Sequence, residues 1–552
     1  MNNTILKFLL IILVFIFCFS LFKNISYPLL WNDESLTAMF GKCILKYGFP
    51  KVHCGNNVIY HTFHPDFKLG IFKDTDAYID GGWLQYYYSI FGTKLSELTE
   101  DIYSKTAIVR IPFALIGFIG LLIMIYILTK FLDNSKGKLI ITALFLLFEI
   151  LSVSLVLHLR EVRYYSLVIF FYSLLIYFYT RYYFFRNISY KKYCLFLILL
   201  MILLLNTSNL HFFIFPATII LIEVFKLIIG IYKHKQISEY FKKFFKSILP
   251  IIITLIVSIP FIIFYKVGPI SRSLSEIKNF NFQIYLTHII TMLRFFYQWE
   301  FLYLVLIIKI FLIYLIFFKK KSFNGDKKLL DFSNFLTLIF LVSIVIIARA
   351  PYFFERYFIF LQPILIIILL VDLYLIYKEI QLEKRTYFII FTLIIFIIGA
   401  GLKIDLVKKH FNELVVPYLG PVDYTIGFIK DNYPQPEKLV IATNYEETAY
   451  MYYLNSKTIF GFVPVNLDAD LREKPDIIIP RRYQFLSSTA AIFNYFLQKD
   501  KYKPIKFPIR DYFVNNIPEL SSHLFKTSLV EDNSQGLMIL IKEKDNFNQP
   551  FR

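Results

Sequence analysis

The chain has 552 residues, of which 57% are hydrophobic, and its mean hydropathy is +0.58. Soluble domains use roughly 45–50% apolar residues, so this composition excludes an ordinary soluble fold. The formal net charge of +19 would suggest nucleic-acid binding in a soluble protein. Here the basic residues fall in short loops between apolar segments, where they set orientation in a bilayer, and we expect no nucleic-acid partner.

The apolar segments predict an all-α polytopic membrane bundle. A hydrocarbon core of roughly 30 Å takes about 20 apolar residues, and the chain offers about eleven such segments, of which the fifth and ninth are short. They are residues 5–22, 108–128, 139–157, 165–180, 194–205, 210–231, 248–265, 301–318, 335–347, 357–377 and 386–401. Residues 282–299 carry His288 and Arg294, so we expect that segment to lie in the membrane interface.

Lysine and arginine predict the orientation of the bundle. The short loops of one face, among them DNSKGK and KKKSFNGDKK, hold about 20 basic residues against about 8 in the opposing loops. This asymmetry predicts a cytoplasmic N-terminus and an extracytoplasmic C-terminus. No cleavage pattern of small residues follows the first segment, which favours a permanent anchor over a removable signal peptide.

Four regions follow from this topology. They are a first transmembrane anchor (1–22), an external loop (23–107), a transmembrane bundle (108–402) and a C-terminal extracytoplasmic domain (403–552). In the last region KLVIAT, PDIIIP and GLMILIKEK read as strands and EETAYMYYL as a helix, which predicts a small α/β domain. No glycine-rich phosphate loop follows KLVIAT, so this domain is expected to have a structural or acceptor-binding role.

The external loop is predicted to contain two short amphipathic helices. One lies in DESLTAMFGKCILKYGFP and stops at Gly48 and Pro50, and the other lies in GGWLQYYYSIFGTKL. We expect both in the outer membrane interface, with Trp83, Tyr86 and Tyr87 at headgroup depth.

The four cysteines are too few for a disulfide framework. Cys18 and Cys194 lie in or at apolar segments and are read as small buried hydrophobic residues. Cys43 and Cys54 fall in the external loop, where they form either a bridge or two free thiols.

Two adjacent carboxylates, Asp33 and Glu34, follow the first span in the sequence WNDES. A carboxylate close to the membrane surface, tuned by low dielectric and nearby cations, suits a general base that takes a proton from an attacking hydroxyl or amine. The alternative is a purely structural role, with Asn32 or Asp33 as a helix N-cap and Glu34 in the first turn.

A second cluster of ionisable residues lies in HLREVRYYSL, at the predicted external end of the third and fourth spans. It contains His158, Arg160, Glu161 and Arg163. Charged groups at membrane depth tend to mark substrate pathways, and guanidinium groups suit phosphate oxygens. The alternative is a solvated turn in which Glu161 pairs with one of the arginines.

The sequence RAPYFFERYFIFLQP forms a third external cluster. Arg356 and Tyr357 are candidates to hold a lipid phosphate, and the alternative is that Arg356 snorkels to the interface. The external loop adds His64 and Asp66 as candidates to touch a sugar or a metal, although they lack a recognisable metal signature. No motif therefore indicates a divalent metal.

The order of these motifs resembles the GT-C glycosyltransferases, in the bacterial branch related to protein O-mannosyltransferases and to the lipid A aminoarabinose transferase. The resemblance rests on WNDESLTAMFGKCILKYGFP, TAIVRIPFALIGFIGLLIMIYIL, REVRYYSL and ERYFIFLQP. It implies a helical membrane bundle with an external active site and a polyprenyl-phosphate sugar donor. It implies Asp33 as the base, Glu34 as a positioning group, and Arg356, Tyr357 and Arg163 as donor-phosphate contacts.

We therefore expect an inverting hexosyl- or pentosyltransferase that acts on an extracytoplasmic lipid, glycan or protein acceptor. One alternative is a transporter or flippase of lipid-linked sugars, and another is a surface polysaccharide polymerase or ligase. A transporter should carry ionisable residues at mid-membrane depth. The candidates for such positions show no paired pattern in the sequence; they are Glu149, Glu223, Lys309 and Asp372.

Overall fold

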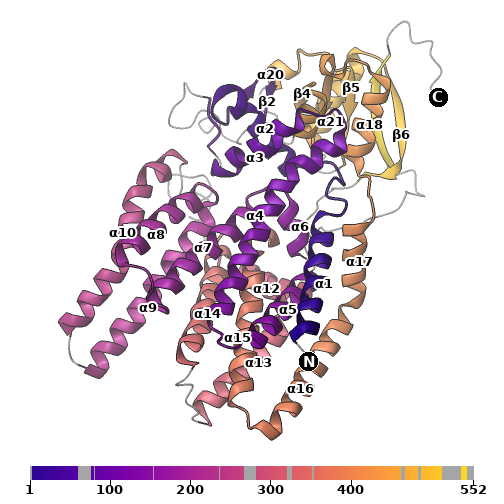
Figure 1. Ribbon diagram of the computed structural model, residues 1–552. Coiled ribbons are helices and arrows are strands. Elements are labelled where there is room, and N and C mark those ends of the chain that lie inside the picture. Colours follow the sequence, from indigo (N-terminus) through magenta and orange to yellow (C-terminus); the bar gives the residue numbers. More distant parts are fainter. Residues whose placement is uncertain are drawn as a thin grey trace. The chain divides into compact units, whose positions relative to one another are not determined.

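The computed structural model (Figure 1) describes most of the chain. The described residues are 3–59, 76–79, 81–152, 154–234, 237–265, 281–319, 326–350, 353–461, 467–482, 487–511 and 536–543. Internal contacts divide the chain into two compact units. The helical unit comprises Met1–Lys23 and Phe113–Val415, and the mixed unit comprises Asn24–Pro112 and Val416–Asn516 with the C-terminal strand.

The helical unit consists of helices throughout its described part. They are α1 (Asn3–Phe22), most of α4 (Ile102–Lys130), α5 (Ser135–Leu151), α6 (Leu155–Arg160), α7 (Tyr165–Tyr183), α8 (Tyr190–Leu205), α9 (Asn209–His234), α10 (Ile237–Phe264), α12 (Phe282–Trp299), α13 (Leu302–Phe317), α14 (Lys327–Ile347), the 3₁₀ turn η5 (Glu355–Phe358), α15 (Leu361–Glu379), α16 (Leu382–Leu402) and α17 (Ile404–Val415). Helix α15 is buried along most of its length and packs against α5, α13 and α14. Apart from the buried Gln362 and Asp372 it is apolar on all sides over most of its length, as expected of a helix enclosed by others.

Within the described residues, seven helices are long and apolar enough to cross a membrane: α1, α4, α9, α10, α14, α15 and α16. The pair α12 and α13 qualifies only when taken together, and it bends by 99° at the break. The expected number of about eleven spans was therefore too high. Helices α5 and α8 have only 17 and 16 residues, and the tyrosines of α7 lower its hydropathy.

The mixed unit joins the segment after the first span to the C-terminal region. Its elements are α2 (Asn32–Tyr47), β1 (His53–Cys54), β2 (Asn57–Val58), α3 (Leu84–Ser96), α18 (Pro421–Asn432), η6 (Pro436–Lys438), β3 (Val440–Thr443), α19 (Glu447–Leu454), β4 (Lys457–Phe460), α20 (Leu467–Asp470), β5 (Ile477–Ile479), α21 (Ser487–Lys499), β6 (Tyr502–Arg510) and β7 (Gly536–Lys542). The sequence predicts the external loop (23–107) and the C-terminal domain (403–552) as separate regions.

The five-stranded sheet of the mixed unit has the order β4-β3-β5-β7-β6. Strand β3 pairs in parallel with β4 and β5, whereas β7 pairs antiparallel with β5 and β6. The predicted strands are confirmed as β3, β5 and β7, and the predicted helix as α19. The prediction missed β4 and β6, which form the two edges of the sheet. Strand β6 contains Pro504 and Pro508, residues that sheets tolerate at an edge.

Helices α2 and α3 are the two helices predicted in the external loop, and they pack against each other. Tyr86 of α3 is 1% exposed and lies against the rings of Phe40 and Tyr78, so protein encloses its side chain. Cys43 and Cys54 form a disulfide, which decides between the two alternatives for these thiols. Close approach requires glycine at Gly92, because a Cβ there would lie 2.7 Å from the Cα of Val109.

Candidate active site

The first turn of α2 carries both candidate catalytic carboxylates. Trp31 is the N-cap and makes no side-chain capping bond, while Asp33 and Glu34 lie in the first turn. The alternative that Asn32 or Asp33 caps this helix is therefore wrong. Asp33 is partly exposed, whereas Glu34 is fully buried. The negative charges near the N-terminus of α2 favour the helix through its dipole.

Glu34 forms a bidentate ion pair with Arg110 of α4. The Arg110 Nε donates to Glu34 Oε1 at 2.8 Å and Nη2 donates to Oε2 at 2.5 Å. The remaining Arg110 nitrogen, Nη1, donates to the backbone carbonyls of Ile25 and Pro28 at 2.9 and 2.8 Å. Both side chains are 0% exposed. This geometry fixes the start of α2, so the pair holds the backbone next to Asp33 in one position.

The C-terminal part of the mixed unit forms hydrogen bonds to the start of α2 and to the residues just before it. The Ser35 hydroxyl lies 2.7 Å from that of Thr448, at the first turn of α19. The Leu30 amide donates to the Tyr453 hydroxyl at 3.0 Å, and the Leu29 amide donates to Asp423 Oδ1 at 3.2 Å. Asp33 is therefore presented by a segment that is hydrogen-bonded to both α18 and α19.

Asp423 is a buried carboxyl group in the first turn of α18. Its Oδ2 accepts from the Gly420 amide at 2.9 Å, and its other oxygen accepts from Leu29. Burial raises the pKa of Asp423 to about 7, and the two backbone donors oppose this shift. The carboxyl group is therefore close to half-protonated at neutral pH.

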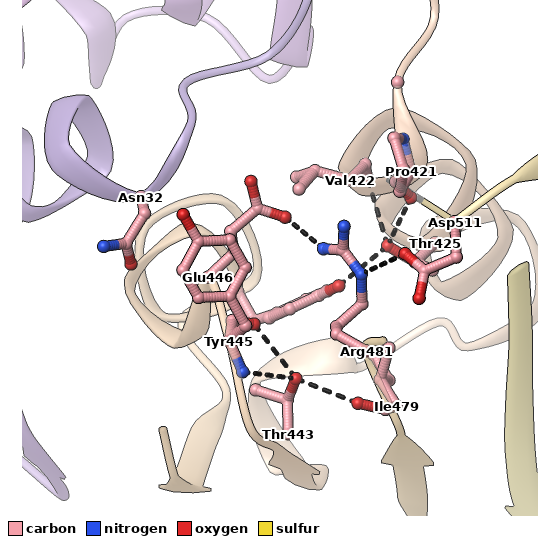
Figure 2. A network of polar contacts seen from close by, with 12 residues as sticks. Asn32, Pro421, Val422, Thr425, Thr443, Tyr445, Glu446, Ile479, Arg481 and Asp511 are labelled. Atoms are coloured by element: carbon pink, nitrogen blue, oxygen red, sulfur yellow. Dashed lines mark hydrogen bonds and ion pairs between the residues drawn. The ribbon is translucent and has the colours of Figure 1, made fainter. Parts of the chain in front are cut away.

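A buried arginine organises the loop that leads into α19. Figure 2 shows Arg481 between Glu446 and Asp511, and it donates to both carboxylates, with Nε 2.7 Å from Asp511 Oδ1. Its backbone amide donates to Asn444 Oδ1 at 2.7 Å, and the Asn444 side chain donates to the Arg481 carbonyl at 2.9 Å. These bonds fix residues 444–446, directly ahead of Thr448. The network therefore stabilises the contact with α2.

In the helical unit, the HLREVRYYSL cluster lies on α6 and the turn after it. His158, Arg160 and Glu161 are all 0% exposed. The His158 Nδ1 lies 2.7 Å from the Ser154 carbonyl, and Arg160 Nη1 donates to the Lys23 carbonyl at 3.1 Å. The alternative of a solvated turn is therefore wrong, because the protein itself encloses these groups.

The predicted donor-phosphate residues lie close together in the helical unit. Arg163, Arg356 and Tyr357 all interact electrostatically with the Tyr164 hydroxyl. The Arg163 guanidinium lies 5.5 Å from the centroid of the Tyr164 ring. Arg356 is 8% exposed, and its guanidinium lies 4.2 Å from the centroid of Phe354. The structure thus brings two arginines and a tyrosine, distant in sequence, to one place.

His211 of α9 supports this cluster and was missed from the sequence. Its Nε2 lies 2.7 Å from the Tyr357 carbonyl, and its Nδ1 lies 2.6 Å from the Ser208 hydroxyl. The imidazole therefore fixes the backbone that carries Arg356 and Tyr357. A lone histidine near the start of an apolar span was the available signal, since a buried imidazole needs partners.

The candidate residues belong to both units. Asp33 and Glu34 lie in the mixed unit, whereas His158, Arg160, Glu161, Arg163, Arg356 and Tyr357 lie in the helical unit. His64 and Asp66 fall outside the described residues. Within the described part of the chain, no group of three or more His, Cys, Asp or Glu residues could hold a metal ion.

Charged residues inside the helical unit do form a pair, contrary to the expectation from the sequence. Lys309 of α13 lies 2.8 Å from Asp372 of α15, and the Ser333 hydroxyl donates to the same carboxylate at 2.6 Å. Glu223 pairs with Lys226 within α9 at 2.7 Å. The Lys309–Asp372 pair was invisible in the sequence because 63 positions separate its members.

No family model matches the sequence, and no curated protein matches it. Solved structures of ArnT from Cupriavidus metallidurans are similar to it in fold. The apo structure shares 11% identity at a TM-score of 0.51 over 97% of each chain. The structure bound to undecaprenyl phosphate shares 10% identity at a TM-score of 0.51 over 98% of each chain. The predicted fold is confirmed: this chain has the fold of ArnT, a bundle of helices with a small C-terminal sheet, and seven helices of its described part are long and apolar enough to cross a membrane.

Proposed function

We propose that this protein is a membrane glycosyltransferase that moves a sugar from a polyprenyl-phosphate donor to an extracytoplasmic acceptor. The observation that carries the proposal is the likeness, over 98% of each chain, to ArnT bound to undecaprenyl phosphate. A shared fold does not by itself determine chemistry, so the roles of individual residues rest on their own contacts. With this function we propose a cell-membrane location, a cytoplasmic N-terminus and an extracytoplasmic mixed unit.

Asp33 is the proposed general base. It lies beside a glutamate that Arg110 holds in a bidentate pair, and the backbone of its helix turn is tied to α18 and α19. A carboxylate held in this way, and itself partly exposed, is positioned to take a proton from an acceptor hydroxyl or amine. Glu34 is proposed to position Asp33, because protein donors occupy both of its oxygens.

Arg163, Arg356 and Tyr357 are the proposed contacts of the donor phosphate. In a single displacement, the acceptor oxygen or nitrogen bonds to the anomeric carbon as the bond from that carbon to the phosphate oxygen breaks. The acceptor proton passes to Asp33, and polyprenyl phosphate leaves with the electron pair. Negative charge grows on the departing oxygen, and guanidinium groups aimed at it lower the barrier. The configuration at the anomeric carbon is inverted.

The test is genetic and chemical. The gene is deleted in its host, and lipid A, surface glycans and glycoproteins are compared by mass spectrometry to find the missing sugar. The wild-type gene should restore that mass, and an Asp33→Asn gene, expressed at the same level, should reduce transfer about 100-fold or more. Full restoration by Asp33→Asn would exclude Asp33 as the base.

Phosphate binding is tested separately with undecaprenyl phosphate and the purified protein. Arg356→Gln should weaken its binding about 10- to 100-fold, since a charge-assisted hydrogen bond contributes about 1.5–3 kcal/mol. Arg294→Gln is the matched control, because Arg294 is an exposed arginine of α12 outside the cluster. Equal affinities for wild type and Arg356→Gln would remove Arg356 from the phosphate site.

A transporter of lipid-linked sugars is the second candidate, favoured by the buried Lys309–Asp372 pair. Its discriminating test is movement of a labelled polyprenyl-phosphate sugar across proteoliposomes. Transport that Asp372→Asn abolishes, without any sugar transfer in cells, would replace the enzyme with a transporter.

A further inference from the structure

A second buried polar cluster lies in the helical unit, apart from the residues assigned to phosphate. It is formed by Glu149 near the end of α5, Glu300 between α12 and α13, and Gln362 in the first turn of α15. All three side chains are 0% exposed. The rings of Phe148 and Phe301 pack edge to face at 4.9 Å, which holds the chain segments of the two glutamates together.

Glu149 is fully buried beside Gln362 and Glu300. Within the described residues, neither of its carboxylate oxygens has a hydrogen-bond partner. It interacts electrostatically with Glu300, a group of the same charge. An ionised carboxylate in such a position is strongly disfavoured unless a positive charge or a proton accompanies it.

Glu300 is satisfied on one side only. Its Oε1 accepts from the hydroxyls of Ser152 and Ser154 at 2.8 and 2.5 Å, whereas its Oε2 has no partner among the described residues. Each serine donates its single proton to the carboxylate, and the Ser152 oxygen also accepts from the Leu155 amide at 3.2 Å. Each hydroxyl oxygen therefore keeps at least one lone pair for a positive ion.

Gln362 is the independent indication of a ligand. Its amide lies close enough to interact with both Glu149 and Glu300. Even so, neither its oxygen nor its nitrogen completes a hydrogen bond within the described part of the chain. A fully buried amide that lies beside two carboxyl groups without completing a hydrogen bond of normal geometry is costly, and this points to an occupant.

The nearest positive charge is Lys403, which follows α16. Its Nζ donates to the Glu300 backbone carbonyl and lies 4.9 Å from the centroid of the Phe301 ring. Burial lowers the pKa of Lys403 to about 8, and the charge of Glu300 opposes this shift, so the ammonium group is mostly charged at neutral pH. Two carboxylates and one ammonium group leave one negative charge uncompensated.

We propose that Glu149, Glu300 and Gln362, with the hydroxyl oxygens of Ser152 and Ser154, bind one hard monovalent cation such as Na⁺. Oxygen donors select hard cations over transition metals. One positive charge balances the cluster, whereas a divalent ion would leave an excess. Ile150 and Leu151, directly after Glu149, line a cavity of about 420 Å³ together with Ser20 and residues of α17, so a cavity borders the segment that carries Glu149.

The experiment uses the purified full-length protein, and it requires no sugar transfer. Thermal unfolding is measured in NaCl, KCl and choline chloride at equal ionic strength. A cation in tenfold excess over its dissociation constant raises the melting temperature by about 1 °C, and we expect this rise in NaCl relative to choline. Retention of radioactive sodium should reach about one ion per chain, as one site requires.

Three variants locate the effect. Glu149→Gln and Gln362→Leu should abolish both the rise in melting temperature and the retention of sodium. Asp372→Asn is the matched control, because Asp372 is an equally buried carboxylate of the same unit that Lys309 already neutralises. It should keep the full response to sodium. If Glu149→Gln does not fold, Gln362→Leu and the wild-type sodium measurement decide the question.

Three results would overturn the proposal. Equal melting temperatures in all three salts without retained sodium would mean that a proton, and no metal ion, accompanies the two carboxyl groups. In a parallel measurement with MgCl₂ and CaCl₂, a rise in either salt without one in NaCl would contradict the charge balance. A response to sodium that persists in Glu149→Gln would place the ion elsewhere.

Discussion

Glu34 in the mixed unit and Glu149 in the helical unit are both completely buried carboxylates near the end of a helix, yet their surroundings differ. Glu34 receives two hydrogen bonds from Arg110, and Arg110 in turn satisfies two backbone carbonyls. Glu149 faces a second carboxyl group and an amide that makes no hydrogen bond among the described residues. Burial alone therefore does not identify function. We call Glu34 with Arg110 a closed pair, because protein groups satisfy both charges, and such a pair indicates a structural role. We call the Glu149 cluster an open cluster, because polar atoms in it lack partners among the described residues, and such a cluster indicates a ligand site.

Two other buried acids lie between these extremes. Asp372 has a lysine and a serine hydroxyl as partners, and Asp423 has two backbone amides but no cation in direct contact within the described contacts. The four carboxylates thus form a series from complete compensation to none. The cost of removing a partner should follow that series.

The largest effect is expected from Arg110→Leu. The variant leaves Glu34 buried and uncompensated, and breaking a buried pair in this way costs about 3–5 kcal/mol. Thermal unfolding of the purified protein measures the loss. The double variant Glu34→Gln with Arg110→Leu should be more stable than Arg110→Leu alone, because no buried charge is left behind. A single variant as stable as wild type would show that Arg110 and Glu34 do not form a closed pair.

A smaller loss is expected from Lys309→Met, about 2–3 kcal/mol. Asp372 keeps the Ser333 hydroxyl and can take up a proton, which limits the cost. The same unfolding measurement applies, and Lys378→Met is the control because its pair with Asp326 is exposed. Equal losses of unfolding free energy in the two variants would mean that burying the Lys309–Asp372 pair does not increase its contribution to stability.

These contrasts also show how far the sequence could be interpreted. Hydropathy predicted the helical bundle, and apolar runs predicted β3, β5 and β7, because central strands are buried on both faces. The edge strands β4 and β6 were missed because neither is an uninterrupted apolar run: β4 begins with Lys457 and Thr458, and lysine and proline interrupt β6. The count of spans was too high because short helices such as α8 can be apolar without being long enough to cross alone.

The candidate site was predictable in its residue types but not in its pairing. The sequence identified Glu34, Arg356 and Arg163, but no periodic pattern connects Glu34 to Arg110, which lies 76 positions later. The three-dimensional fold alone reveals that Glu149 and Glu300 share one cluster. Compensation of buried charge depends on tertiary contacts, and local sequence carries no record of them.

Asp423 predicts a dependence of stability on pH. Its pKa of about 7 in the folded protein exceeds the usual value of 3.8, so the folded state binds a proton more tightly than the unfolded state. The resulting stabilisation is complete below about pH 4 and disappears as the pH rises through about 7. A tenfold difference in proton affinity corresponds to about 1.4 kcal/mol, so stability should fall by about 2 kcal/mol between about pH 5 and pH 7.

The control for this effect is Asp423→Asn. The asparagine keeps an acceptor oxygen for the Leu29 or Gly420 amide but has no proton to exchange, so that part of the pH dependence should vanish. Melting temperatures of both proteins across this pH range provide the comparison. Parallel pH profiles for the two proteins would assign the dependence to another group.

The smallest effect, and the sharpest contrast with Glu34, is expected for Glu149→Gln in a solution without sodium. The substitution removes the one negative charge of the cluster that Lys403 leaves uncompensated, so stability should stay equal or rise by about 1 kcal/mol. Glu34→Gln, measured side by side, should destabilise the protein, because it leaves the Arg110 guanidinium buried without its counter-charge. The two substitutions are chemically identical, so opposite signs can come only from the surroundings. If both variants lost stability equally, Glu149 would also be compensated within the protein, and the distinction between a closed pair and an open cluster would fail.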